Sequence, residues 1–309
     1  MKDEFKQMKE NNLKNCVGGL KLLLCLTFGV LINSLWACNF NASRQEETIV
    51  GQDTSQFAYT LTSSDIFTMP AALEEVSGIT YLTAFPHTIF AVQDEEGILF
   101  TFDLNKREVI SQFKFADRGD YEGLASDGTY FFVLKSNGDI YSFPIGTTDK
   151  SAVKQHTALL PNGEYESMAY DPQAKRLHVL CKSCKDDKKT KATTGYILNL
   201  SSDGALSVEN TFVIRIDEIR QLDKTMGKSF KASAMAKHPV KDEWYIISSV
   251  DRSLIVTNDD FIVQRVIRFE RDTFEQPEGL TFDEQLNLYI SSEAGNKAEA
   301  KIYRIKPKP

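Results

Sequence analysis

The sequence lacks the short motifs that mark common catalytic centres. It contains no GxSxG nucleophile elbow, P-loop, HExxH zinc motif or GxGxxG fingerprint, so no nucleophile or general base follows from a motif. It also lacks an excess of positive charge, since 36 Lys and Arg stand against 43 Asp and Glu, a net charge of −7. Nucleic-acid phosphates select basic surfaces, so the composition gives no electrostatic case for nucleic-acid binding.

Cysteine is scarce in the body of the chain. Of the five cysteines, three precede residue 40, which leaves only Cys181 and Cys184. This CxxC supplies half of a structural zinc site, and no βαβ pattern around it favours a thioredoxin-like redox centre. In an exported protein we expect either a local disulfide between Cys181 and Cys184 or two thiols at a loop.

The sequence also lacks an apolar run long enough for a confident membrane span. Residues 22–32 are apolar, which suits the core of a secretory signal. The residues Leu35-Trp36-Ala37-Cys38 that follow resemble the lipobox of bacterial lipoproteins, although Trp36 departs from the usual small residue. The resemblance implies a signal peptide over 1–37 and a lipidated Cys38 that holds the chain on the outer or plasma membrane, outside the cytoplasm. An uncleaved signal anchor with an incidental Cys is the alternative.

Residues 38–56 are rich in Asn, Ser, Gln, Glu and Thr and have little to pack. Such a composition is typical of a flexible tether between an anchor and a folded domain. The folded part is therefore expected to begin near residue 57.

A repeated motif organises the rest of the chain. The stretch 276–282, QPEGLTF, has weaker copies upstream in which a small residue precedes an apolar one. These small residues lie 45, 44, 67 and 45 residues apart, at Gly78, Gly123, Ser167, Ala234 and Gly279. A period of about 40 to 50 residues built from short strands is typical of β-propeller blades. Residues 57–309 are therefore predicted to form a single all-β propeller domain.

Four of the repeats divide into four strand-like runs each, whereas the last offers only three before the chain stops. An exposed edge is avoided in folded proteins, so residues 57–67 are predicted to supply the missing outer strand. This gives five four-stranded blades closed by an N-terminal strand, with six blades as the alternative. The longest interval contains residues 216–224, whose apolar residues have helical spacing, and we expect a short inserted helix there.

The first strand of each blade lines the central channel, so the motif predicts a ring of equivalent positions. The ring holds Glu122, Glu166 and Glu278, and the antiparallel second strands end at the same mouth with Asp94 and Glu293. Carboxylates that face one another need a cation, protons or basic partners. Oxygen ligands without thiolate or imidazole favour Ca²⁺ or Mg²⁺. The alternative is that these acids cap strand ends, pair with lysines and are solvated.

Several stretches together resemble the SdiA-regulated, YjiK-like family of bacterial cell-envelope propellers. They are LEEVSGITYL, TIFAVQDEEGILFTFDL, DYEGLA and QPEGLTFDEQLNLYISSE, and the resemblance covers about residues 70–308. It implies an envelope propeller related to a calcium-regulated group. The carried-over positions are Glu122, Glu166, Glu278, Asp94 and Glu293, while Lys231 and Ser233 depart from the acidic pattern in the fourth repeat.

Three functions remain open at this stage. The first is a membrane-tethered propeller that binds a divalent cation or small ligand at the acidic mouth without turnover. The second is a Ca²⁺-dependent hydrolase of phosphate esters or lactones. The third is a non-catalytic scaffold for an envelope protein. Because one fold supports many functions, the propeller alone does not choose among them.

Overall fold

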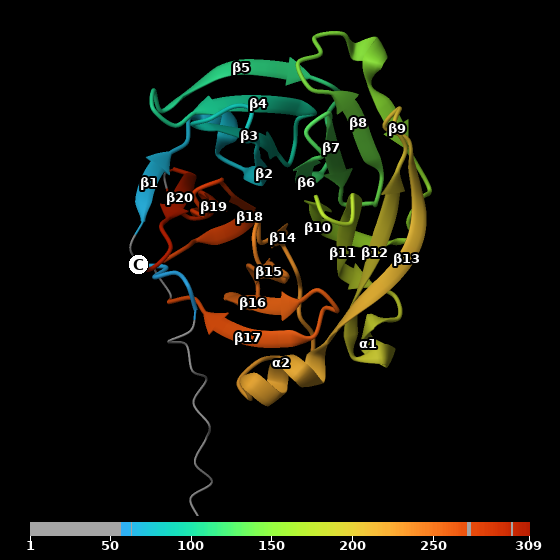
Figure 1. The fold of residues 1–309 in the computed structure, drawn as a ribbon, viewed down its shortest axis with the longest axis vertical. Helices are drawn as coiled ribbons and strands as arrows, with labels where there is room; N and C mark the ends of the chain where they lie inside the picture. Colours follow the sequence, from blue (N-terminus) through green and yellow to red (C-terminus); the bar gives the residue numbers. More distant parts are fainter. Residues whose placement is uncertain (1–56, 63, 271–272, 298) are drawn as a thin grey trace, which may run out of the picture. The chain divides into compact units, whose positions relative to one another are not determined.

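The computed structural model describes residues 57–62, 64–270, 273–297 and 299–309. The predicted signal peptide (1–37), lipidated Cys38 and tether (38–56) lie outside the described residues. The described chain forms five antiparallel four-stranded sheets, which lie around a common centre with their first strands innermost (Figure 1). The predicted five-bladed β-propeller is confirmed.

Blades 1 to 4 place their strands in chain order from the centre outwards. Blade 1 comprises β2 (Val76–Tyr81), β3 (Thr88–Gln93), β4 (Ile98–Asp103) and β5 (Glu108–Lys114). Blade 2 comprises β6 (Tyr121–Ser126), β7 (Tyr130–Lys135), β8 (Ile140–Pro144) and the short β9 (Lys154–His156). Blade 3 comprises β10 (Gly163–Asp171), β11 (Arg176–Cys184), β12 (Ala192–Leu200) and β13 (Leu206–Arg215). Blade 4 comprises β14 (Ala234–Lys237), β15 (Glu243–Ser248), β16 (Ser253–Asn258) and β17 (Val263–Arg268).

Blade 5 joins the two ends of the chain. It comprises β18 (Gln276–Phe282), β19 (Leu288–Glu293), β20 (Lys301–Ile305) and, as its outer strand, β1 (Asp65–Thr68). β1 pairs antiparallel with β20, and Arg304 Nη2 lies 2.8 Å from Asp65 Oδ2. The predicted closure by an N-terminal strand is confirmed, and it removes the edge that β20 would otherwise expose.

The hydrophobic core is divided into five clusters, and each lies between two neighbouring blades. One cluster packs Phe90 and Val92 of blade 1 against Phe131 and Phe143 of blade 2, for example. The other four clusters fill the remaining interfaces around the ring, including the interface between blades 5 and 1 that contains Phe67 of β1. Burial on both faces explains why the inner strands carry few exposed side chains.

The repeated small residue of the motif lies where neighbouring inner strands approach most closely. A Cβ on Gly78 would lie 2.5 Å from the backbone N of Leu124, and one on Gly279 would lie 2.5 Å from the backbone O of Ser77. These distances are far shorter than van der Waals contact, so the ring admits only small residues there.

Helical structure is confined to short segments. α2 (Ile216–Leu222) is the helix predicted between blades 3 and 4, and it lies beside β17 at the perimeter (Figure 1). Its Ile216 and Ile219 are buried against the cluster between those blades. α1 (Asp187–Thr190) and the 3₁₀ turns Ala71–Leu73 and Lys150–Ala152 complete the set in the described residues. None of the helices described there is long and apolar enough to cross a membrane.

Candidate cation-binding site at the acidic mouth

The acidic residues of the motif lie on backbone bulges. The pairing of the first two strands shifts register between Tyr121 and Gly123. It does so again between Tyr165 and Ser167 and between Pro277 and Gly279. A bulge inserts one unpaired residue and turns its side chain out of the regular alternation. The residues inserted are Glu122, Glu166 and Glu278, the three predicted ring acids, and β2 has a related shift between Val76 and Ile79.

Antiparallel pairing brings the other two predicted acids to the same end of the channel. Glu293 is the last residue of β19, and Asp94 follows β3 directly. We call this end, where the inner strands begin, the acidic mouth. In blades 1 and 4 the ring positions hold Ser77 and Ser233, whose hydroxyls donate to the backbone oxygens of Glu122 (3.2 Å) and Pro277 (2.8 Å). The ring position is therefore a glutamate in three blades and, in the other two, a serine that hydrogen-bonds to the neighbouring inner strand.

The five carboxyl groups perturb one another. Burial, with a further contribution from the carboxylates of Glu166 and Asp120, raises the pKa of Glu122 to about 9. Burial and Glu166 raise the pKa of Glu278 to about 8. At the ends of the second strands, burial and neighbouring carboxylates raise the pKa of Glu293 to about 7 and that of Asp94 to about 6. In the absence of a cation, Glu122 and Glu278 therefore hold their protons at neutral pH.

One basic side chain enters this cluster. Lys182, at the end of β11, donates from Nζ to Glu166 Oε1 and lies 3.8 Å from Glu164 Oε1. Burial still raises the pKa of the Glu166 carboxyl, which is only 5% exposed. Among the described residues, this is the one ion pair that any of the five predicted acids forms with Lys or Arg. Pairing with lysines thus accounts for a single member of the cluster.

Two carboxylate oxygens in the acidic mouth are buried without a hydrogen-bond partner in the described part of the chain, namely Glu166 Oε2 and Asp94 Oδ1. Buried polar atoms are normally satisfied, so such atoms call for a ligand or a proton. The oxygens are not gathered into a ready cage, however. Within the described ranges, no three acidic side chains at this mouth bring a ligand oxygen each within 4.8 Å of one another.

The CxxC forms the C-terminal end of β11 and includes Lys182, which enters the acidic mouth. The structure joins Cys181 to Cys184 as a disulfide with a Cα–Cα distance of 5.9 Å. The backbone N–H of Cys184 donates to Asp187 Oδ2 at 3.2 Å. Cys181, Cys184 and Asp187 form the one described group of three ligand-type side chains close enough to share a metal. A disulfide occupies both sulfurs, which favours a structural role.

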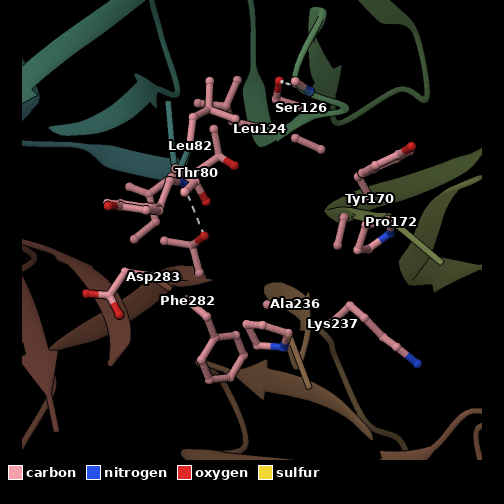
Figure 2. A pocket seen from close by; sticks show the side chains of 18 of the residues that line it. Thr80, Leu82, Leu124, Ser126, Tyr170, Pro172, Ala236, Lys237, Phe282 and Asp283 are labelled. Atoms are coloured by element: carbon pink, nitrogen blue, oxygen red, sulfur yellow. Dashed lines mark hydrogen bonds between the residues drawn. The ribbon is translucent and has the colours of Figure 1, made fainter. Parts of the chain in front are cut away.

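Sequence reasoning missed a cavity at the other end of the channel, where the inner strands end. We call this end the opposite mouth. The cavity has a volume of about 590 Å³, and residues of all five blades line it (Figure 2). Many of its lining residues belong to the repeated motif or directly follow it, but their mixed apolar and hydroxyl character gives no pattern that marks a site.

Solved structures similar to this chain include two enzymes. The chain is similar to glutaminyl cyclase from Myxococcus xanthus, with a TM-score of 0.53 and 12% identity over 79% of this chain and 94% of that one. It is also similar to a luciferin-regenerating enzyme, with a TM-score of 0.49 and 10% identity over 79% and 95% of the two chains. At such identities the likeness concerns the fold alone. No curated protein matches the chain.

A family model matches most of the chain, not only the repeated motif. The model of a family described as SdiA-regulated matches residues 51–296. That range begins before β1 and runs past β19, so it takes in the closing strand and all five bulged or equivalent ring positions. The match agrees with the resemblance carried by the motif stretches. The chain therefore belongs to the SdiA-regulated family.

Proposed function

We propose that this chain is a binding protein of the bacterial envelope that takes up a divalent cation at the acidic mouth and turns over no substrate. The observation that carries the proposal is Glu166, whose buried Oε2 has no partner in the described residues although the same carboxyl receives Lys182 on its other oxygen. An atom in that position gains from a cation, because it is desolvated and surrounded by further carboxylates.

The donor chemistry fits calcium better than a transition metal. The acidic mouth offers carboxylate oxygens and serine hydroxyls, and calcium takes six to eight oxygen ligands with flexible geometry. Zinc and copper prefer imidazole or thiolate, and neither lies among the five acids. Because the oxygens are too far apart for a preformed cage, the cation would be held by movement of the side chains or by bridging waters.

The sequence before residue 57 supports the envelope part of the proposal. The apolar run, the Leu35–Cys38 stretch and the polar tether occur in the order of a lipoprotein leader. A diacylated or triacylated Cys38 would anchor the propeller stably, since two or more acyl chains suffice for lasting membrane attachment.

Nothing favours the hydrolase alternative over binding. The likeness to a cyclase is a likeness of fold at 12% identity, and fold does not carry activity. The scaffold alternative differs from ours in one respect: it predicts that the ring acids can be neutralised without loss of the bound partner.

The test is calcium titration of the full chain in detergent by isothermal calorimetry. The parent is compared with the triple variant Glu122→Gln, Glu166→Gln, Glu278→Gln. The control is Glu108→Gln, Asp242→Asn, Glu299→Gln, which removes three exposed acids elsewhere. Saturable heat in parent and control but not in the ring variant supports the site. Absence of heat in the parent, or equal binding in the ring variant, refutes it, and calcium-dependent cleavage of esters or lactones would contradict a purely binding role.

A further inference from the structure

The cavity at the opposite mouth has a chemical character unlike that of the acidic mouth. We infer that it is a second binding site, for a small uncharged molecule with a largely apolar body and a hydrogen-bond acceptor such as a carbonyl. The inference concerns the other end of the inner strands. β18 alone spans seven residues, which at about 3.3 Å per residue separates its two ends by roughly 20 Å.

The charged groups around this cavity are already engaged. Asp283 accepts from the backbone N–H groups of Gln285 (3.0 Å) and Asn287 (2.8 Å) and, on its other oxygen, from the Tyr289 hydroxyl (3.0 Å). Asp127 accepts from the N–H groups of Thr129 and Tyr130 in the same way. Both carboxylates cap the turn that follows an inner strand, which is a structural task.

The one cation of the lining is engaged as well. Lys237 pairs with Asp259, lies over the Trp244 ring at 5.2 Å and has a side chain only 2% exposed. Figure 2 shows the charged ends of Lys237 and Asp283 directed away from the middle of the cavity. The remaining charged residue of the lining, Glu284, is exposed and accepts from Gln285 Nε2 at 2.8 Å. A charged ligand would therefore meet only groups that already have partners, and burying it would be costly.

The cavity surface is mainly apolar. Its lining includes Leu124, Met168 and Met235 of the inner strands and Phe85 and Val240 of the turns. Phe85 is 41% exposed and Val240 is 70% exposed. A ligand that removes this surface from water gains about 25 cal/mol per Å² covered.

Two hydroxyls supply the polar contact. Thr281 Oγ1 accepts the backbone N–H of Tyr81 at 3.2 Å, so its own proton remains available to a ligand. Thr80 comes from the adjacent blade, lines the same cavity and has no hydrogen-bond partner for its hydroxyl among the described residues. Both hydroxyls are able to donate to an acceptor, which is why a carbonyl suits the ligand.

The size of the cavity selects a small molecule rather than a polypeptide. About 590 Å³ falls within the range of about 300–1,000 Å³ that is usual for small-molecule pockets. Residues of all five blades line the cavity, so it is not a groove along one sheet (Figure 2).

The probe we would use is benzophenone, which is neutral, has two phenyl rings and one carbonyl, and on irradiation links to nearby C–H groups. The full chain in detergent is irradiated with increasing benzophenone, and labelled peptides are located by mass spectrometry. We expect saturable labelling of the peptides that contain Met168 and Met235. Labelling that is absent from these peptides or rises linearly without saturation would overturn the inference.

Two valines of blade 4 provide a matched pair. Val240 is 70% exposed in the turn at the opposite mouth, and Val250 is 63% exposed in the turn at the acidic mouth. Val240→Glu should reduce labelling at least fivefold, because it places a carboxylate beside the apolar rim. Val250→Glu should leave labelling unchanged, and an equal effect of both variants would refute the site.

The hydroxyl contact has its own test. Thr80→Val removes a hydroxyl that serves no protein hydrogen bond, so the fold should survive. It should raise the benzophenone concentration that gives half-maximal labelling about fivefold, the value of one neutral hydrogen bond. The affinity of diphenylmethane, which lacks the carbonyl and is measured as a competitor of labelling, should not change, and an equal loss for both molecules would contradict the assigned acceptor. These readouts are independent of calcium, so either site can fail alone.

Discussion

Single residues on the inner strands decide how closely the blades can approach. A Cβ at Gly279 would lie 2.2 Å from Ser291 Oγ and 2.5 Å from the backbone O of Ser77, an atom of the neighbouring blade. Gly279→Ala should therefore lower the free energy of unfolding by about 1–3 kcal/mol, the usual cost of overpacking. Urea denaturation followed by fluorescence measures it. Gly227→Ala is the control, because its nearest neighbour would be at 3.6 Å, and an equal loss there would refute the explanation.

Lys182 is predicted to stabilise the acidic mouth by pairing with Glu166. Their side chains are 23% and 5% exposed, and removal of one partner of a buried pair costs about 3–5 kcal/mol when the other stays charged. Lys182→Met should therefore destabilise the protein more above neutral pH than at acidic pH, where protonation of Glu166 relieves the unpaired charge. Lys189→Met, which breaks the exposed pair with Asp186, should change stability little at any pH. Equal, pH-independent losses would contradict the role of Lys182.

At the residue scale the sequence predicted positions better than partners. The repeated motif located Glu122, Glu166 and Glu278 because a bulge recurs at the same point of the inner strands β6, β10 and β18. The motif did not predict the ion pair between Lys182 and Glu166, because that pair depends on the register of β10 with β11. The cavity at the opposite mouth was missed because its lining is shared among five blades, and each blade contributes ordinary apolar and hydroxyl residues.

Among the elements, β1 carries the closure of the ring. Its residues alternate, so Phe67 is buried in the cluster between blades 5 and 1 while Ile66 is 45% exposed. Phe67→Ala should cost about 3–5 kcal/mol and expose the edge of β20. Ile66→Ala, on the outer face of the same strand, should cost far less. Urea denaturation and light scattering test this, and a stable, monomeric Phe67→Ala protein would show that closure does not depend on β1.

The elements show where sequence periodicity suffices and where it does not. The helix expected within residues 216–224 is α2, at Ile216–Leu222, because apolar spacing distinguishes a helix from a strand directly. Strands β10 and β11 extend beyond the repeated motif and reach Gly163 and Cys184. The extension follows a bulge and runs through the CxxC, which as a sequence looks like a loop. Long-range pairing, not local pattern, decides such strand ends.

On the scale of the whole molecule, the buried carboxyls and the buried histidines change stability in opposite directions as pH changes. The folded pKa of Glu122, Glu278 and Glu293 lies above the ordinary value of 4.5, so the folded protein binds more protons than the unfolded chain between that value and about pH 9. Their contribution to stability is complete below the ordinary value and is lost as pH rises. Burial lowers the pKa of His178 and His238 to about 4, which removes stability below the ordinary value of 6.5. Three raised carboxyls outweigh two lowered imidazoles, so stability without calcium should already decline with rising pH above about pH 5.

Calcium should reverse the alkaline loss, because it replaces the protons and binds only the folded state. The midpoint of thermal unfolding of the full chain, measured from about pH 5 to about pH 9, should fall on the alkaline side without calcium and recover with it. The effect of calcium should be small at the acidic end, where protons compete for the same carboxylates. The ring variant Glu122→Gln, Glu166→Gln, Glu278→Gln should show a flatter alkaline limb and no calcium response. A calcium response that persists in this variant would place the cation elsewhere, and a parent whose stability rises with pH would contradict the burial of these acids.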